Sequence, residues 1–315
     1  MGQITVIGGS GFLGRHLIAR CEGWSVTSLD RVAFPSNVSH PQDFRAVVCD
    51  ASSEPETLRE SCRGSDAVWI RAGMVGGAKS TAVGQAEAYI KTNCGIVRAA
   101  LDACSQTGCS RVFFDSTEQV WGTSGDLEQQ EADEEPSVSN FYGASKLMCE
   151  KLLYLWANER DGRSVQIFRY SRVREGATRD VLYHMASACL QGKPIRIIGN
   201  PAHRVSFVHV EDVIEANFIA LRRRPRFAIY HVSADRPHAI LDLARLVREV
   251  AGTPQAPISF ARGASSPMFE PFVTGMAWER SAQLLGRMPQ WNIAEMILET
   301  VGILRSGAGS EVKIL

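Results

Sequence analysis

The sequence predicts an α/β fold: a doubly wound parallel sheet with a smaller C-terminal lobe. Short apolar strands alternate with helical patterns from residue 4 to residue 168, as in proteins whose helices cover both faces of a parallel sheet. A glycine-rich turn, Gly8–Gly14, separates the first strand from the first helix. With 315 residues, 45% hydrophobic and 22% charged, the chain has the length and composition of a folded protein with a sizeable core.

Charge and cysteine content exclude several classes of protein. Lys and Arg together number 34, as do Asp and Glu, so bulk charge favours neither a nucleic-acid nor a membrane partner. No apolar run reaches the length of a membrane-spanning helix, and Gln3–Ile7 is too short for the apolar part of a signal peptide. The 8 cysteines form no Cys-x-x-Cys pair and show no histidine at metal-ligand spacing. We therefore expect free thiols, no metal site and a cytoplasmic protein.

The first strand, Ile4–Ile7, and the first helix, Phe12–Arg20, enclose a turn that fits both Gly-x-Gly-x-x-Gly and Gly-x-x-Gly-x-x-Gly. Glycines permit a tight turn, let the backbone approach a pyrophosphate and let the helix pack close to the strand. The free N–H groups and positive dipole of a helix N-terminus favour phosphate. We therefore expect a dinucleotide here. The candidate cofactor-binding residues of the turn are Gly8, Gly11, Phe12, Leu13 and Gly14.

The second strand, Ser25–Leu29, ends in Asp30. A carboxylate about twenty residues past the glycines suits the ribose 2′-hydroxyl of NAD and repels the 2′-phosphate of NADP. Arg31 is a second candidate contact, because an arginine at this place could receive a 2′-phosphate. The sequence favours NAD.

The third and fourth strands continue the pattern. The third, Ala46–Cys49, ends at Asp50, a candidate partner of the adenine, and Ala51 beside it is a further candidate cofactor contact. A short helix, Glu56–Cys62, follows.

The fourth strand, Ala67–Ile70, leads into a loop in which Ala72 and Gly73 are expected to lie over the cofactor, since ligands bind at the carboxyl ends of such strands. A helix over Gln85–Cys104 comes next. It carries Asn93, another candidate cofactor contact.

A fifth strand, Arg111–Phe114, precedes the hydroxyl of Thr117 and then a helix that begins at Tyr142. The spacing of four places Tyr142 and Lys146 on one helix face, one turn apart. An ammonium beside a phenol stabilises phenolate and lowers the pKa of the tyrosine from about 10 towards the working pH. Such a tyrosine can act as a general acid or base.

The remaining segments are assigned to two domains and a tail. A strand over Val165–Phe168 continues the sheet, and the later helices are expected over 240–251, 278–286 and 293–304. The predicted dinucleotide-binding domain comprises 1–169 and 206–233, and the substrate-binding lobe comprises 170–205 and 234–305. Residues 306–315 are predicted to form a mobile tail.

Three stretches carry a resemblance to a known family. Ser116–Gly122 matches Ser-(Ser/Thr)-x-x-Val-Tyr-Gly, with Trp121 in place of the tyrosine. Tyr142 and Lys146 match a catalytic pair, and Arg204–Val213 is similar to Arg-Asp-Phe-Val-His-Val-Asp-Asp-Val. Through these motifs the chain resembles the extended short-chain dehydrogenases/reductases of the NAD-dependent epimerase/dehydratase family, from the glycine turn almost to its end.

The resemblance implies a Rossmann fold, NAD as cofactor and hydride transfer coupled to proton transfer. Tyr142 would take the proton from a substrate hydroxyl, Lys146 would stabilise phenolate and hold the nicotinamide ribose, and Thr117 would hydrogen-bond the reacting oxygen. The family also implies a homodimer through the helices Gln85–Cys104 and Tyr142–Glu159.

The chain departs from the family pattern at positions that bear on the reaction. Members that dehydrate sugars carry Asp-Glu after the catalytic threonine, whereas this chain has Glu118-Gln119, and an amide cannot act as a base. Arg172 stands where the family has an asparagine that contacts a diphosphate. Arginines could clamp a diphosphate or a carboxylate. The candidate substrate-binding residues are Glu118, Arg172, Arg204 and Arg262.

We therefore expect an NAD-dependent epimerase of a nucleotide-activated sugar, working by transient hydride transfer at a ring hydroxyl. The alternative is a net NAD(P)-dependent dehydrogenase or reductase acting on a secondary metabolite or another substrate without a nucleotide. A cofactor sensor without turnover is disfavoured, because such a protein has no need to keep Thr117, Tyr142 and Lys146 together.

Overall fold

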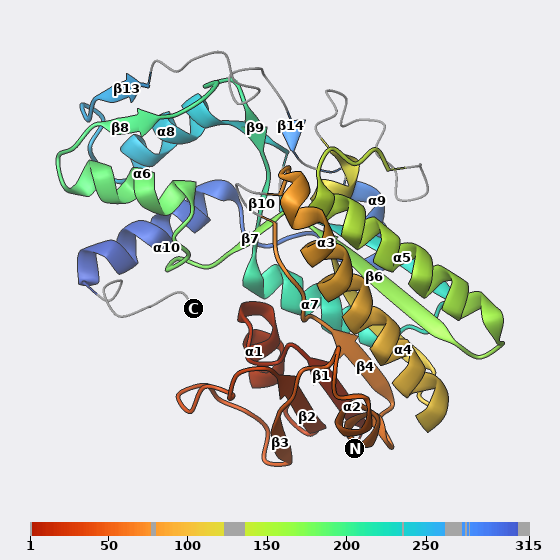
Figure 1. Cartoon of the computed structure of the whole chain (residues 1–315). Helices are drawn as coiled ribbons and strands as arrows, with labels where there is room; N and C mark the ends of the chain where they lie inside the picture. The colour runs from red at the N-terminus through yellow and green to blue at the C-terminus, as the bar shows by residue number, and fades with distance from the viewer. Residues whose placement is uncertain are drawn as a thin grey trace. The chain divides into compact units, whose positions relative to one another are not determined.

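The helices and strands of the computed structural model fall into two units (Figure 1). The structure describes residues 2–76, 80–122, 136–234, 236–261, 273–274, 276 and 278–307. The first unit contains the described residues up to 122 together with 136–169 and 214–230, and the second contains those within 170–213 and 231–307.

A seven-stranded sheet forms the centre of the first unit, in the order β11-β6-β5-β4-β1-β2-β3. Its strands are β1 (Gln3–Ile7), β2 (Ser25–Asp30), β3 (Phe44–Val48), β4 (Ala67–Ile70), β5 (Arg111–Thr117), β6 (Ser164–Tyr170) and β11 (Phe227–Val232). The pairs that join β3, β2, β1, β4 and β5 are parallel. The strand order reverses at β1, which lies between β2 and β4, and ligands bind at the carboxyl ends of strands at such a reversal. The predicted doubly wound α/β fold is confirmed.

Helices cover both faces of this sheet (Figure 1). They are α1 (Phe12–Ala19), α2 (Pro55–Cys62), α3 (Ala86–Tyr89), α4 (Gly95–Thr107), α5 (Phe141–Glu159) and α7 (Val210–Leu221). Helices α2, α4 and α5 share one apolar core with the strands, and α1 and α7 lie on the opposite face.

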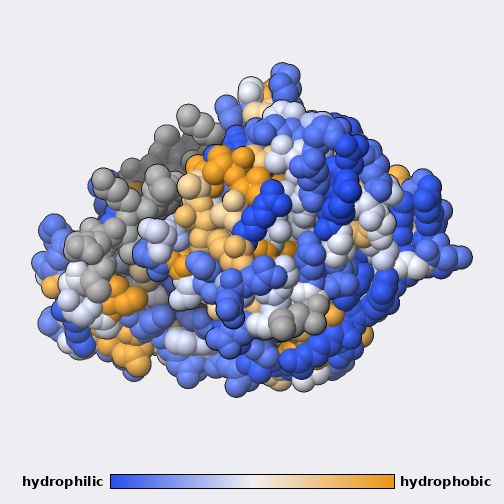
Figure 2. All heavy atoms as spheres, turned by 90° about the horizontal axis from the view of Figure 1, so that it is seen from below, coloured by the Kyte–Doolittle hydropathy of each residue, from blue (hydrophilic) through white to orange (hydrophobic). Residues whose placement is uncertain are grey.

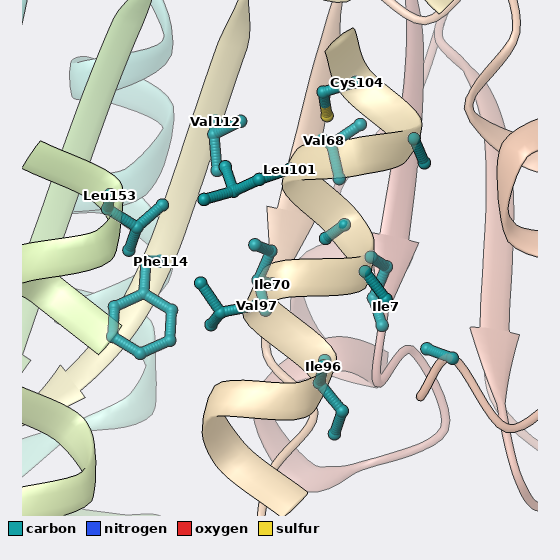
Figure 3. Packing of buried hydrophobic residues seen from close by; sticks show 14 of the residues in the cluster. Ile7, Val68, Ile70, Ile96, Val97, Leu101, Cys104, Val112, Phe114 and Leu153 are labelled. Carbon is teal, nitrogen blue, oxygen red and sulfur yellow. The ribbon is translucent and has the colours of Figure 1, made fainter. Parts of the chain in front are cut away.

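Successive side chains of a strand point to opposite faces of the sheet, which explains how both faces of this sheet become apolar. Val68 and Ile70 of β4 point into the core under α4, where Val97 and Leu101 meet them (Figure 3). Trp69, between those two strand residues, points to the other face and stacks on Phe113 of β5 with ring centroids 4.3 Å apart. A sheet buried on both faces requires such continuous apolar strands.

The predicted helix over Gln85–Cys104 is interrupted. A 3₁₀ turn, Val83–Gln85, precedes α3, and a π-helical turn, Ile90–Cys94, separates α3 from α4. π-turns often occur at functional sites, and this one carries Asn93, whose side chain is buried. Helix α4 ends at Thr107 because Gly108 adopts a left-handed conformation with φ of 80°.

The described part of the second unit contains three longer helices, one short helix and small sheets. The helices are α6 (Val181–Leu190), α8 (Ile240–Val250), α9 (Glu279–Leu285) and α10 (Ile293–Ser306). The strands are β7 (Arg172–Arg174) with β10 (Phe207–His209), β8 (Ile195–Ile197) with β13 (Ile258–Phe260), and β9 (Arg204–Val205) between β12 (His238–Ala239) and β14 (Val273–Thr274). Helices α6, α8 and α10 enclose a second apolar core.

The boundary between the units differs from the predicted one at two segments. Residues 206–213 and 231–233 were expected in the dinucleotide-binding domain but cluster with the second unit. The reason for the first segment is its pairing: β10 joins β7 in a separate two-stranded sheet, and the carboxylate of Asp212 accepts hydrogen bonds from the backbone of Gln290 and Trp291. For the second segment, the backbone N–H of His231 donates to Ser281 of α9. Of the predicted tail, Ser306 belongs to α10 and residues 308–315 lie outside the described residues.

In the part of the chain that the structure describes, no helix has both the length and the apolar character needed to cross a membrane. Hydrophilic residues cover most of the face shown in Figure 2, with smaller apolar areas between them.

Candidate active site

The glycine turn between β1 and α1 has no room for a side chain at Gly8 or at Gly14. Gly8 adopts φ of 92°, and a Cβ there would lie 2.3 Å from the backbone nitrogen of Ala72. A Cβ on Gly14 would lie 2.3 Å from the carbonyl oxygen of Gly8. Gly11 is the N-cap of α1 and offers no side chain to the N–H groups of Phe12 and Leu13. The turn therefore leaves a helix N-terminus available to an anion, which fits the pyrophosphate of a dinucleotide.

Asp30 lies at the end of β2 with its carboxylate turned to the glycine turn. One oxygen accepts from the Ser10 N–H at 3.1 Å, and the other from the Val32 N–H at 3.4 Å. An acceptor at this place suits a ribose hydroxyl. Arg31 is exposed, and its charge helps to lower the pKa of Asp50, after the larger effect of hydrogen bonds from Ser52.

Those hydrogen bonds occupy one oxygen of Asp50. Its Oδ1 accepts from the Ser52 hydroxyl at 2.6 Å and from the Ser52 N–H at 3.0 Å. The residue thus closes the turn after β3, and Ala51 is buried within that turn. An adenine partner at this position would use the remaining carboxylate oxygen.

Asn93 holds the loop that follows β4. Its Oδ1 accepts from the Met74 N–H at 2.7 Å, and its Nδ2 donates to the Ser145 hydroxyl at 2.9 Å. A Cβ on Gly73 would lie 2.9 Å from the same Oδ1 and 3.5 Å from Nζ of Lys146. Asn93, predicted as a cofactor contact, therefore joins the 72–74 loop to α5 with its own amide.

Thr117, Tyr142 and Lys146 meet at the carboxyl end of β5. Thr117 is the last residue of that strand, and the other two lie in the first two turns of α5, which the Asn140 side chain caps by accepting from the Gly143 N–H at 2.8 Å. All three are buried, and Tyr142 and Thr117 share a side-chain hydrogen bond. This arrangement unites the three residues to which the sequence assigns the chemistry.

Burial governs the charge state of this group. Desolvation raises the pKa of Tyr142 to about 12, although the hydrogen bond with Thr117 acts in the opposite direction. The predicted lowering of this pKa by Lys146 is not borne out, because desolvation has the largest effect on the phenol and raises its pKa. Burial also lowers the pKa of Lys146, whose Nζ donates to the Asp115 carbonyl at 2.8 Å.

Two buried ion pairs flank the group, and the sequence did not predict them. Arg169, at the end of β6, donates to Glu150 of α5 at 2.7 Å, and Glu150 accepts from the Ser116 hydroxyl. The second pair is Arg71 with Asp115, 3.2 Å apart. Opposite charges at the ends of the neighbouring strands β4 and β5 are the signal that could have revealed the second pair.

Two of the positions at which the chain departs from the family pattern, Trp121 and Glu118-Gln119, make defined contacts in the structure. Trp121 is buried, and the Arg169 guanidinium lies 5.0 Å from its ring centroid. Glu118 is buried, and the backbone N–H of Gln119 donates to the Thr117 hydroxyl at 3.2 Å. That contact orients Thr117.

Two of the arginine candidates belong to the second unit. Arg172 in β7 and Arg204 in β9 are exposed, and Nε of Arg204 donates to the Pro237 carbonyl at 3.1 Å. Arg262 lies outside the described residues. Within the described ranges, no cluster of three or more His, Cys, Asp or Glu residues could hold a metal ion.

Known proteins resemble this chain in sequence and in fold. The model of the NAD dependent epimerase/dehydratase family matches residues 4–233. The UDP-glucose 4-epimerase of Lacticaseibacillus casei is 24% identical over 67% of this chain and 69% of that protein. The dTDP-glucose 4,6-dehydratase of Streptomyces niveus is 23% identical over 79% of this chain and 78% of that protein. Among solved structures, MoeE5 in complex with UDP-glucose and NAD has a TM-score of 0.82 at 23% identity, covering 98% of this chain and 100% of that one, which shows a shared fold.

Proposed function

Because the chain belongs to the NAD-dependent epimerase/dehydratase family, we propose that it is an epimerase of a nucleotide-activated sugar, acting at a ring carbon that bears a hydroxyl. The observation that carries the proposal is the buried group of Thr117, Tyr142 and Lys146 at the carboxyl end of β5. It shares the first unit with a glycine turn suited to a pyrophosphate. The similarity to a UDP-glucose 4-epimerase supports the substrate class.

The chain's residues would hold the cofactor and move the proton. NAD, when bound, supplies a reversible hydride acceptor. The glycine turn and Asp30 would hold it at its pyrophosphate and ribose. Tyr142 would receive the proton of the substrate hydroxyl at its Oη and return it, with Thr117 as the hydrogen-bond partner of the reacting oxygen. A positive charge beside a phenol lowers its pKa. Bound NAD would bring the positive charge of its nicotinamide, so we expect Tyr142 to become an effective base only when NAD is bound.

Epimerisation is favoured over dehydration by the residues after Thr117. Elimination of water needs an acid and a base beside the reacting carbons. Gln119 provides an amide, which does neither, and its backbone is committed to Thr117. Glu118 remains as the single carboxyl of the pair, and we propose that it contacts the substrate.

Arginines of the second unit are the proposed anchors of the substrate. Arg172 and Arg204 are exposed cations on β7 and β9, and Arg262 is the third candidate. Charge-assisted contacts from arginine suit a diphosphate. An anchored diphosphate would leave the sugar free to present either face.

The test is incubation of purified protein with UDP-, dTDP- and GDP-sugars, with products identified by NMR and NADH followed by absorbance. We expect an epimer of one sugar without net NADH. Stoichiometric NADH release, or turnover only with added NADH, would establish the alternative, a net dehydrogenase or reductase.

Tyr142→Phe is the matched variant for this assay. We expect turnover to fall by roughly 10²–10⁴-fold or more, because the general acid/base is removed. NAD binding, measured by calorimetry, should stay near the wild-type value. Wild-type turnover in the variant would remove Tyr142 from the mechanism.

A further inference from the structure

A buried guanidinium connects the glycine turn to the proton-transfer residues. Arg71 follows β4, and its backbone N–H donates to the Ile7 carbonyl at 2.8 Å. A Cβ on Gly8 would lie 2.8 Å from the carbonyl carbon of Arg71, so the turn packs directly on this residue. The Arg71 side chain is only 1% exposed. Its charge is therefore held inside the protein.

The side chain reaches across the sheet to β5. Nη1 of Arg71 lies 3.2 Å from Oδ2 of Asp115, the guanidinium lies 5.1 Å from the Trp69 ring centroid, and Nη2 donates to Asn217 of α7. The carbonyl of the same Asp115 accepts from Nζ of Lys146. Asp115 thus binds Arg71 through its carboxylate and Lys146 through its backbone.

The carboxylate of Asp115 disfavours ionisation of the Tyr142 phenol, which the proton transfer requires. Charges interact strongly where water is excluded, and a negative charge opposes ionisation of a nearby phenol. Desolvation has the largest effect on both residues: it raises the pKa of Tyr142 and lowers that of Lys146. The charge of Asp115 adds to the rise at Tyr142 and opposes the fall at Lys146. The other groups that act electrostatically on this pair are Tyr89, Cys94, Cys149 and Glu150. The carboxylate of Glu150 forms an ion pair with a different arginine, Arg169.

We propose that Arg71 is a positioning residue of the proton-transfer centre: its charge offsets that of Asp115, so that Asp115 can hold Lys146 without placing an uncompensated negative charge beside Tyr142. The proposal rests on the proposed function only in taking Tyr142 as the proton carrier. Arg71 does not need to touch substrate or cofactor to act in this way. Its backbone also fixes the glycine turn, so one residue sets both the turn and the charge balance.

The test reads the ionisation of Tyr142 directly. The protein is labelled with 3,5-difluorotyrosine, whose phenol is more acidic than that of tyrosine, and titrated by ¹⁹F NMR, with the signal assigned through Tyr142→Phe. Asp115→Asn should lower the Tyr142 midpoint, and Arg71→Gln should raise it, each by roughly one pH unit. Arg71→Lys and the double variant Arg71→Gln/Asp115→Asn should stay close to the wild type.

Opposite shifts separate a charge effect from a structural one. Arg163→Gln is the matched control, because Arg163 is also a buried guanidinium over a tryptophan, 4.2 Å from the Trp156 centroid, and pairs with Glu159 at the far end of α5. It should leave the midpoint unchanged. Shifts of the same sign in the two single variants, or no shift, would overturn the proposal. If Arg71→Gln does not fold, the Tyr142 midpoint of the double variant must lie above that of Asp115→Asn. Equal midpoints in these two variants would also overturn the proposal. No substrate is used, so the result is independent of the epimerase assignment.

Discussion

The phenol of Tyr142 titrates in the folded chain at a pKa of about 12, because burial disfavours its charged form. A tyrosine in an unfolded chain titrates near pH 10. Between these values the folded state binds the proton more tightly than the unfolded state does. The stability contributed by the neutral phenol is therefore fully present below about pH 10 and is lost as the pH rises through the folded pKa.

We accordingly predict an alkaline loss of stability that depends on Tyr142. The wild type should lose roughly 2–3 kcal/mol of unfolding free energy between about pH 10 and pH 12 through this residue. Tyr142→Phe, which cannot ionise, should lack that component. Urea unfolding of both proteins across this range measures the difference. Parallel stability curves would show that Tyr142 is not desolvated as the structure has it.

Asp30 should decide between NAD and NADP, because its carboxylate faces the glycine turn from the end of β2. Asp30→Gly should weaken NAD binding by roughly tenfold or more through loss of a charged hydrogen-bond acceptor, and it should relax the rejection of NADP. Asp30→Asn is the matched control, since it keeps an acceptor for the Ser10 N–H without the charge. Calorimetry with both dinucleotides tests this. Tighter NADP binding by the wild type would assign the ribose to Arg31 instead.

Residues with local signatures could be predicted, and residues whose role depends on distant partners could not. Gly8 and Asp30 stand at fixed distances from a strand end, so their places follow from the fold. Arg71 and Asp115 are 44 positions apart and become partners only because β4 and β5 are neighbours in the sheet. The raised pKa of Tyr142 likewise depends on packing that no local pattern reveals.

Helix α5 depends on its first turn, because that turn carries Tyr142. Asn140 caps it by accepting from the Gly143 N–H, and a Cβ on Gly143 would lie 2.3 Å from the Gln119 carbonyl oxygen. The helix start therefore packs directly against the 3₁₀ turn Glu118–Trp121 that follows β5. The cap thus sets where the phenol lies relative to Thr117.

We predict that Asn140→Ala costs about 1 kcal/mol of unfolding free energy and also lowers kcat through fraying of this turn. Asn292→Ala is the matched control, because Asn292 caps α10 in the second unit by accepting from the Glu295 N–H at 3.0 Å. It should cost similar stability and leave kcat unchanged. Denaturant unfolding and turnover assays of both variants test the pair. Equal effects on kcat would remove the positional role of the cap.

Element boundaries show what periodicity can and cannot reveal. The strands β1 and β4 follow from apolar runs closed by turn residues. β5 runs on to Thr117, three residues beyond the predicted end, because Asp115 and Ser116 are satisfied by Arg71 and Glu150 inside the protein. From the sequence alone, where those partners are not known, polar residues at a strand end predict a turn. The π-turn at Ile90–Cys94 leaves no periodic signature in so short a segment.

The family resemblance predicts that the whole molecule is a homodimer, and the exposed face of α5 supports that prediction. Met148 and Leu155 are seven residues apart on one face of this helix and are 45% and 64% exposed, and Ile90 in the neighbouring π-turn is 44% exposed. Apolar side chains in such a row favour burial against a partner helix, and a C₂ interface would bring the same face of a second copy against it.

Light scattering at micromolar concentration should therefore give twice the 34.5 kDa mass of the chain. Leu155→Glu should produce monomers, because two uncompensated carboxylates would be buried near the dimer axis, raising the dissociation constant by roughly a hundredfold or more. Leu298→Glu on α10 is the matched control: Leu298 is similarly exposed, at 59%, but lies outside the helices that the family pairs. It should remain dimeric. A wild type that is monomeric, or a dimer that Leu298→Glu disrupts and Leu155→Glu does not, would place the interface elsewhere or remove it.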